Sequence, residues 1–433
     1  MAVVCVTWGC ESRAKRLAAQ CLVAEFAVYC LPFLRAYGHS TTSLILIVSL
    51  LVAVNCVGQI LAVGSHRGTR FNVPKVGDIG CVLLLPMVAY LLASSIPLFG
   101  WDVLTAWAPY ADGLIESEFN MAIAGLPVGW RHSYANATVL ASLSIDAFLD
   151  GSQRSVAAAW LTTYLALAMV AGCVVFSLTK RATVTVLAMV LLTSIPLLEN
   201  HALIYGYTEL KLSFFSMSLM WVFVDLHQKM SGSAIILGFL AIAGAGLTRN
   251  TGIFYAAVII TAGATPWLVS CFSLSSQLTL KRVCGLTILL STASVILAAV
   301  KESTFNVAGK TLTLNVSKLS QSLLSEFVAL FVNSSFNLTF LGFLFCVVHW
   351  AKIESKSVRD SEAFIAAQVL LMASMYLTVS MMFSLLSEYG LQHALPGADT
   401  GNSRFHLPVV SIALVATVCY VTINVLNCQT NHE

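Results

Sequence analysis

IGCVLLLPMVAYLLASSIPLF, residues 79–99, is the stretch that decides the fold. It contains no charged residue, and its length matches the ~20 apolar residues that a helix needs to cross a bilayer. Trp101 and Asp102 follow after a single glycine, and the next apolar run opens only at Ser155. The pattern therefore predicts a membrane-spanning helix followed by a long loop, residues 100–154, that opens with a carboxylate at the membrane surface.

Similar apolar runs recur along the whole chain. Of its 433 residues, 58% are hydrophobic and 10% are charged, whereas a soluble protein carries about 25% charged residues. We therefore predict an all-α fold, a polytopic bundle of transmembrane helices that forms one integral membrane domain over residues 1–433. About twelve spans are expected, with eleven to thirteen as the range, because the short fifth and seventh runs also fit tilted, broken or re-entrant segments. The expected spans are residues 18–36, 42–64, 79–99, 155–178, 182–199, 209–227, 233–248, 251–273, 283–300, 333–350, 362–386 and 405–427.

The rest of the composition narrows the classes of partner. Residues 1–17 carry Arg13, Lys15 and Arg16 but no apolar core with a cleavage site, so we expect a retained cytosolic tail. The net charge of +3 is spread through the loops without a basic tract, so nucleic acid is not an expected partner. The twelve cysteines form no pair or Cys/His cluster with metal-ligand spacing, so no metal site is predicted from them.

The distribution of positive charge predicts the orientation. If the N-terminus is cytosolic and the spans alternate, fourteen of the 23 Lys and Arg residues lie on the cytosolic side. The loops at residues 100–154 and 301–332 are then non-cytosolic. Four Asn-x-Ser/Thr triplets, the acceptor motif for N-glycosylation, fall in or beside non-cytosolic segments and begin at Asn136, Asn315, Asn333 and Asn337. Both signals place Asp102 on the lumenal or extracellular side.

Asp102 is the first candidate for chemistry. A carboxylate at the end of a membrane helix is partly desolvated and still reaches water, which suits a general base. The alternative is a solvated helix-end residue without a catalytic role. Trp101 and Trp107 likewise have an alternative explanation as aromatic residues of the membrane interface.

A second polar cluster is ENHALIYGYTELK, residues 199–211, on the same expected face. Glu209 and Lys211 open the sixth expected span, where charged side chains must be paired or must face water. These residues are therefore candidates for a site. The alternative is a simple ion pair at the membrane boundary.

Two isolated arginines complete the set. Arg249 lies in the turn GLTRNTG, residues 246–252, and Arg404 lies in TGNSRFHLP, residues 400–408. Each suits a phosphate oxygen held by charge-assisted hydrogen bonds, and each equally suits snorkelling to a lipid headgroup. All these clusters fall on one membrane face, so acids for proton transfer and cations for a phosphate would share one water-accessible cavity.

The motifs occur in an order that resembles a known family. They are WD at 101–102 with Trp107, HSY at 132–134, GYTEL at 206–210, GLTRNTG at 246–252, and SRF at 403–405 before LP at 407–408. Over about residues 79–410 the series resembles the polytopic GT-C glycosyltransferases, in particular the dolichyl-phosphate-mannose-protein mannosyltransferase-like and lipopolysaccharide sugar-transferase-like members. Two departures are present. Ala135 replaces the family's Pro after Tyr134, and the turn at Arg249 keeps a positive charge but lacks the family's acid.

The resemblance implies a GT-C-like fold whose long first non-cytosolic loop carries the active site. It also implies a transferase that moves a hexose, mannose being one candidate, from a polyprenyl- or dolichyl-phosphate donor with inversion. The acceptor would be a lumenal or extracytoplasmic glycan, lipid or protein. The implied location is the endoplasmic reticulum or another endomembrane, with a bacterial inner membrane as the alternative.

The resemblance also implies roles for individual residues. Asp102 would be the catalytic base, with Glu209 as a second catalytic carboxylate. No cofactor is assigned, although some members of the family use a divalent cation, for which Asp102 with Glu209, Asp112 or Glu116 would be the ligands. The donor phosphate would be held by Arg404, Arg249 and Lys211. The expected substrate contacts are Trp101, Trp107, His132, Tyr134 and Tyr207.

Two other classes of function remain open. A transporter or lipid flippase needs ionisable residues in mid-span, whereas most charges in this chain cluster at one face. A non-catalytic membrane subunit would not need acids and arginines to converge, and the departures from the family motifs also fit a diverged or inactive relative.

Overall fold

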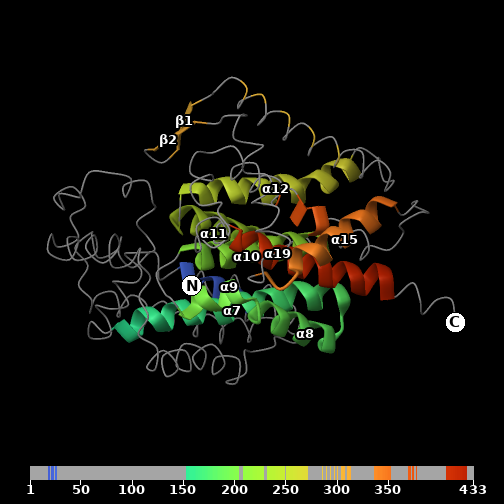
Figure 1. Cartoon of the computed structure of the whole chain (residues 1–433). Coiled ribbons are helices and arrows are strands. Elements are labelled where there is room, and N and C mark those ends of the chain that lie inside the picture. Colours follow the sequence, from blue (N-terminus) through green and yellow to red (C-terminus); the bar gives the residue numbers. More distant parts are fainter. Residues whose placement is uncertain are drawn as a thin grey trace, which may run out of the picture.

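The structure is a computed structural model, in which the described residues form a bundle of helices (Figure 1). It describes residues 18, 19, 21–23, 25, 26, 153–203, 208–228, 232–248, 250–271, 285, 289, 293, 297, 300, 304–307, 310–313, 336–352, 369–371, 373, 374, 377 and 406–426. The second and third expected spans lie outside these residues. So does the main expected loop up to residue 152.

The described helices follow the expected apolar runs. The fourth to eighth expected spans become six helices with bounds close to those predicted, because the fifth span is divided in two. The tenth and twelfth begin later than expected by six and two residues. The helices are α7 (Gln153–Thr179), α8 (Ala182–Thr193), α9 (Pro196–Leu203), α10 (Thr208–Gln228), α11 (Gly232–Thr248), α12 (Asn250–Cys271), α15 (Thr339–Lys352) and α19 (Leu407–Tyr420), which continues as the π-helical turn η6 (Val421–Leu426).

One short hairpin departs from the all-α prediction. β1 (Thr304–Val307) pairs antiparallel with β2 (Lys310–Thr313), and Val307 lies opposite Lys310. Both strands are four residues long and rich in β-branched residues, which favour strands. They fall in the expected loop at residues 301–332, where a scan for apolar runs does not detect such short strands.

The described part contains helices suited to a membrane. Trp160–Thr179 of α7 and Thr208–Gln228 of α10 are long and apolar enough to span a bilayer, and α8 with α9 forms a third, bent candidate. Shorter apolar helices cover Ala234–Thr248, Thr339–Lys352 and Leu407–Ile423. These helices fit an integral membrane protein, whereas the expected number of twelve spans extends beyond the described residues.

The fifth expected span is broken, which was one of the forms predicted for it. α8 ends at Thr193 and α9 begins at Pro196, and the two helices meet at 66°. Proline has no backbone N–H, and its ring displaces the carbonyl four residues earlier, so a helix kinks or stops there. The seventh expected run, which had the same alternatives, is instead the continuous helix α11.

A basic turn separates α7 from α8. Lys180 has a φ of 53°, a left-handed conformation that ends helices, and its N–H donates to the carbonyl of Phe176 (3.0 Å). Its ammonium donates to the carbonyl of Ser177 (2.6 Å). Lys180 therefore closes α7 through both its backbone and its side chain, and the chain reverses into α8.

Contacts at two levels show that α7 and α10 run in the same direction. The Lys211 ammonium lies 3.4 Å from the Thr163 hydroxyl oxygen, and the Gln228 amide donates to the carbonyl of Ser177 (2.8 Å). Later residues of one helix thus meet later residues of the other. α12 follows the same direction, because a Cβ on its Gly263 would meet the ring of Phe223 near the end of α10.

α11 runs in the opposite direction to α10. A Cβ on Gly244 would lie 2.2 Å from the ring of Phe215, whereas a Cβ on Gly238 would lie 3.3 Å from Val222. A side chain at Gly244 would force the ring of Phe215 to move, so glycine permits the close approach of the two helices at this position.

α15 and α19 also run in the same direction. Gly342 packs near Thr417, and the ring of His349 lies edge-on to Tyr420, with 3.1 Å between His349 Nδ1 and the tyrosine hydroxyl. Asn337, just before α15, donates its side-chain amide to the carbonyl of Ser194 after α8 (2.6 Å). The start of α15 therefore lies beside the end of α8.

These directions define one end of the bundle, which we name the Thr208 end. α10, α12 and α15 begin there, and α8 and α11 finish there. α19 begins at the same end, because it runs parallel to α15. The alternation agrees with successive crossings of a membrane.

α10 is the centre of the described bundle (Figure 1). Residues 208–222 of this helix are all buried, and the helix packs against α7, α11, α12 and α19. Its aromatic residues Phe214, Phe215 and Trp221 are at most 1% exposed. Because α10 is enclosed on most sides, the charged residues in its first turns are enclosed as well.

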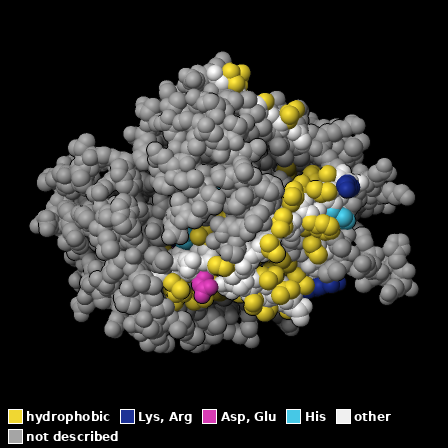
Figure 2. Space-filling model, viewed as in Figure 1, with side chains coloured by type: hydrophobic (Ala, Val, Ile, Leu, Met, Phe, Trp, Pro, Cys, Tyr) yellow, Lys and Arg dark blue, Asp and Glu magenta, His cyan; other side chains and the backbone are white. Residues whose placement is uncertain are grey.

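The outer surface is apolar over three helices. Figure 2 shows a broad band of hydrophobic side chains on the side of the molecule where α8 and α15 lie. Surfaces of this kind mark contact with a membrane or with another protein. The exposed side chains are Val186, Leu187, Val190 and Leu191 of α8, Ile235, Ile236 and Phe239 of α11, and Leu341, Leu344, Phe345 and Val348 of α15.

Candidate functional site

Two of the predicted site residues lie in the described part of the chain, namely Glu209 and Lys211 in the first turn of α10. The structure places both at the Thr208 end, and both are buried. The remaining predicted site residues lie outside the described residues. They are Asp102, Arg404, Arg249, Trp101, Trp107, His132, Tyr134 and Tyr207, together with the proposed cation ligands Asp112 and Glu116.

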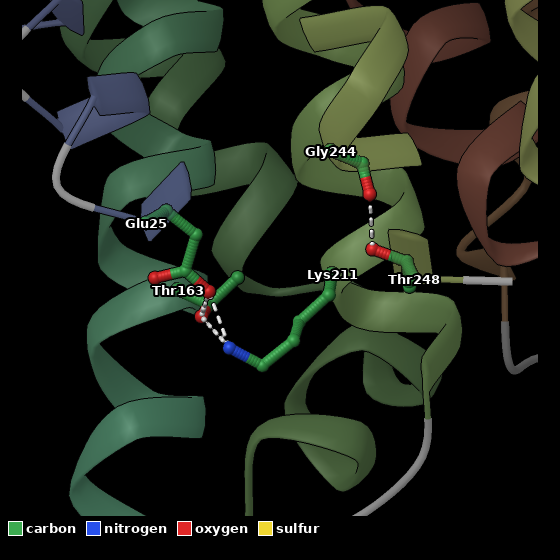
Figure 3. Close-up of polar contacts among 5 residues, drawn as sticks. All are labelled: Glu25, Thr163, Lys211, Gly244 and Thr248. Atoms are coloured by element: carbon green, nitrogen blue, oxygen red, sulfur yellow. Dashed lines mark hydrogen bonds and ion pairs between the residues drawn. The ribbon is translucent and has the colours of Figure 1, made fainter. Parts of the chain in front are cut away.

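Lys211 is the centre of a buried polar cluster (Figure 3). Its side chain is 1% exposed, and its ammonium forms an ion pair with the carboxylate of Glu25. The hydroxyl of Thr163 donates to the same carboxylate oxygen (2.8 Å), and its oxygen lies 3.4 Å from the ammonium. The ammonium also lies 4.7 Å from the centre of the Trp160 ring, at a distance that suits a cation–π contact. We name these four residues the Lys211 cluster.

The sequence alone left an ion pair at the membrane boundary as the alternative for Glu209 and Lys211. The observed partner of Lys211 is instead Glu25, 186 residues away. Positions two residues apart point about 200° away from each other around a helix, so Glu209 and Lys211 do not face one another. Glu25 was missed as a site residue because it lies inside the first expected span. When the spans alternate in direction, Glu25 and Lys211 are not expected at the same depth in the membrane.

A signal for the pair was present in the sequence. An acid inside an apolar run is costly unless a base neutralises it, and Glu25 is such an acid. Lys211 was already recognised as a base that needed a partner. Matching these two residues would have required knowing that the first span packs against α7 and α10, which no local pattern reveals.

Glu209 lies in the same turn of α10 and is 4% exposed. An acid in the first turn of a helix is favoured by the partial positive charge of the helix N-terminus. The hydroxyl of Ser213 donates to the backbone carbonyl of Glu209 (2.7 Å) and reinforces this turn. The arrangement gives α10 a buried carboxylate and a buried ammonium within its first four residues.

The polar cluster at residues 199–211 continues into α9. His201 is 3% exposed, and its Nδ1 lies 2.8 Å from the carbonyl of Leu197, one turn earlier. A carbonyl only accepts, so Nδ1 carries the proton in this contact. Glu199 in the same helix is exposed. α9 thus brings one exposed acid and one buried histidine to the Thr208 end.

The break before α9 is closed by side chains from two other parts of the chain. The Tyr164 hydroxyl of α7 donates to the carbonyl of Thr193. The Asn337 amide donates to the carbonyl of Ser194. These bonds satisfy carbonyls that a continuous helix would have satisfied with its own N–H groups.

The neighbours of the two predicted arginines are described even though the arginines are not. Thr248, which precedes Arg249, is buried at the end of α11, and its hydroxyl donates to the carbonyl of Gly244 (2.7 Å; Figure 3). His406, two residues after Arg404, is buried directly before α19. Both positions belong to the Thr208 end, which also holds Glu209.

A metal site is not formed by the described side chains. Within the described ranges, no group of three His, Cys, Asp or Glu residues gathers closely enough to hold a metal ion. Three of the four carboxylates named as cation ligands, Asp102, Asp112 and Glu116, lie outside those ranges. A role for a divalent cation therefore rests on the sequence resemblance alone.

Comparisons with protein-family models, with curated proteins and with solved structures matched no protein. The resemblance to the GT-C glycosyltransferases thus rests on the sequence motifs.

Proposed function

We propose that the chain is a membrane glycosyltransferase of the GT-C type. It transfers a sugar from a polyprenyl- or dolichyl-phosphate donor to a lumenal or extracytoplasmic acceptor. The observation that carries the proposal is the convergence of helix ends at the Thr208 end. The start of α10 with Glu209, the junction of α11 and α12 next to Arg249 in sequence, and the start of α19 next to Arg404 in sequence lie at the same end of the bundle, and α10 packs against α11, α12 and α19.

The proposed reaction is an inverting displacement. Asp102 takes the proton of the acceptor hydroxyl while its oxygen forms a bond to the anomeric carbon of the sugar. The bond from that carbon to the phosphate oxygen breaks, and the lipid phosphate leaves with the electron pair. Arg404 and Arg249 stabilise the negative charge that develops on the phosphate. Glu209 is the second carboxylate of the site.

The proposal gives Lys211 a different role from the one that the sequence suggested. Its ammonium is already held by Glu25 and is buried, so a contact with the donor phosphate would require this ion pair to open. The phosphate contact of Lys211 stays a prediction. The proposal relies on the two arginines as cations and on the Lys211 cluster to anchor the first turn of α10.

The aromatic and polar residues of the main loop supply the sugar and acceptor contacts in this proposal. These are Trp101, Trp107, His132, Tyr134 and Tyr207. The apolar surface over α8, α11 and α15 faces lipid, where the polyprenyl chain of the donor is dissolved. We place the protein in the endoplasmic reticulum or another endomembrane, because its acceptor triplets fit that compartment.

A second candidate function is transport of a lipid-linked or other polar substrate. One observation favours it, namely the buried ion pair of Glu25 and Lys211 between two apolar helical segments. Ionisable pairs inside a membrane bundle often mark the path of an ion or substrate. The sequence contains few ionisable residues inside its apolar runs, and Glu25 is one of them.

One experiment separates the two candidates. The purified protein is reconstituted into liposomes with a panel of polyprenyl- and dolichyl-phosphate sugars, and both the chemical state and the leaflet of the donor are followed. A transferase releases free polyprenyl phosphate. Movement of intact donor between leaflets, with no release of polyprenyl phosphate in the presence of glycan, lipid and peptide acceptors, would overturn the proposal in favour of transport.

A further inference from the structure

The break between α8 and α9 leaves two backbone carbonyls that need donors. In a continuous helix the carbonyls of Thr193 and Ser194 would accept from the N–H groups four residues later. The 66° bend at Pro196 redirects the chain, and these carbonyls accept from side chains instead. A carbonyl freed by the bend is costly in apolar surroundings unless it finds a donor, and here the side chains of Tyr164 and Asn337 supply the donors.

The two donors come from opposite directions in the sequence. Tyr164 precedes the break by 29 residues, and Asn337 follows it by 143 residues. Tyr164 also lies directly after Thr163, which holds Glu25 in the Lys211 cluster. One turn of α7 therefore supports both the start of α10 and the break before α9.

The backbone at Asn337 is shaped for this contact. Asn337 has a φ of 47° and Leu338 a φ of 58°. Asparagine enters this left-handed region readily, whereas leucine does so rarely and with strain. The carbonyl of Leu338 then accepts from the N–H groups of Leu341 and Gly342 (3.0 and 3.1 Å), which starts α15. Two consecutive left-handed residues in a single turn indicate a conformation that the surrounding structure imposes.

The same asparagine begins one of the four acceptor triplets, Asn337-Leu338-Thr339. The side-chain nitrogen of Asn337, which would carry a glycan, is the atom that donates to Ser194. The side chain of the third residue, Thr339, is buried at 6% exposure. Asn337 itself is exposed, so the triplet is folded into the bundle at its third residue, while the side chain of its first residue is bound to Ser194.

We propose that Asn337 is a positioning residue, whose amide holds the α8–α9 break together with the Tyr164 hydroxyl, and that this contact rather than a glycan is the role of the triplet. We name the two hydrogen bonds from Asn337 and Tyr164 the clamp, and the clamp fixes the direction of α9. That helix carries Glu199 and His201, and it leads to the first turn of α10. The inference deepens the proposed function by naming what holds this part of the site, but its test needs no donor or acceptor.

Two variants separate the clamp from a glycan. Asn337→Asp keeps the shape of the side chain but replaces the N–H donor by an oxygen that repels the carbonyl of Ser194. Thr339→Val destroys the triplet and leaves Asn337 intact, so it is the matched control. The readout is the distance between spin labels attached at Leu187→Cys in α8 and Asn200→Cys in α9, two exposed positions, in a background with the other cysteines replaced.

The clamp predicts that Asn337→Asp shifts and broadens the distance distribution, whereas Thr339→Val leaves it unchanged. In gel electrophoresis, Thr339→Val should migrate as the wild type does, both before and after treatment with a glycosidase. An equal shift in both variants would show that the glycan is what matters and would overturn the proposal.

Tyr164→Phe keeps the test decisive if Asn337→Asp does not fold. It removes one hydroxyl and preserves the ring, so the packing of α7 is retained. We expect a shift of the α8–α9 distance distribution in the same direction as for Asn337→Asp. An unchanged distance distribution in Tyr164→Phe would refute the clamp, whether or not Asn337→Asp is also unchanged. This conclusion does not depend on the outcome of the transferase assay.

Discussion

Neutralising Glu25 should destabilise the protein more than neutralising both members of its ion pair. The substitution Glu25→Gln keeps the size of the side chain and an acceptor oxygen, but it leaves the ammonium of Lys211 as an uncompensated buried charge. Breaking a buried pair from one side costs about 3–5 kcal/mol of unfolding free energy. We expect the upper part of this range, because Lys211 is 1% exposed and neither the neutral hydroxyl at 3.4 Å nor the ring at 4.7 Å carries a charge that would replace the carboxylate.

Removing the base should cost less. In Lys211→Met the carboxylate of Glu25 keeps the hydrogen bond from Thr163, and it is 12% exposed, so water reaches it in part. In the double variant Glu25→Gln with Lys211→Met both charges are absent. Replacing a whole buried pair by neutral residues is often neutral, and in measured cases stabilises by about 1–4 kcal/mol. The double variant should therefore be more stable than either single variant.

The assay is unfolding of the purified protein in mixed micelles by titration with SDS, which gives an unfolding free energy for each variant. Glu199→Gln is the matched control, because it neutralises an exposed acid of α9 and should change stability by at most ~0.5 kcal/mol. The reasoning fails if Glu25→Gln behaves like this control. It also fails if the cost of the double variant equals the sum of the two single costs, since independent sites add.

Three further predictions concern packing, donor binding and topology. Gly244→Ala should destabilise by about 1–3 kcal/mol in a thermal unfolding assay, because its Cβ would overlap Phe215, whereas Gly232→Ala has open space and should be neutral or slightly stabilising. A Gly244→Ala variant as stable as Gly232→Ala would contradict the close approach of α10 and α11. Arg404→Ala should raise the apparent KM for the donor far more than that for the acceptor, and unchanged donor use would remove Arg404 from the phosphate site. A cysteine at Asn136 should resist reagents confined to the cytosol, and labelling there would reverse the predicted orientation.

The positions of the described helices could largely be predicted, because apolarity determines them. The sequence predicted helices at 155–178 and 209–227, and the structure has them at Gln153–Thr179 and Thr208–Gln228. In each case polar residues end the run on both sides. The break in the fifth run was foreseen as one alternative, and Pro196 gives its physical reason.

Features set by local backbone geometry could not be predicted from the sequence. α15 begins at Thr339 and not at 333, because Asn337 and Leu338 adopt left-handed conformations that apolarity does not encode. The hairpin of β1 and β2 is too short to leave a periodic signal.

The site was predictable only in part, because its contacts join distant segments. Glu209 and Lys211 were recognised from their charge at the start of a span. The partner of Lys211 was not recognised, because Glu25 lies 186 residues away and no local pattern shows that the first span packs against α10. The bond from Asn337 to Ser194 was missed for the same reason, since the triplet had an independent interpretation as a glycosylation site.

The most direct test of the central claim is donor cleavage by the wild-type protein compared with Asp102→Asn in lipid nanodiscs. Release of polyprenyl phosphate from the donor that the panel identifies is measured by mass spectrometry, with thermal unfolding as the control for folding. Loss of a general base typically lowers the rate by about 10²–10⁴-fold, and we predict a loss in this range with unchanged stability. Turnover near the wild-type rate in a folded Asp102→Asn variant would contradict the account.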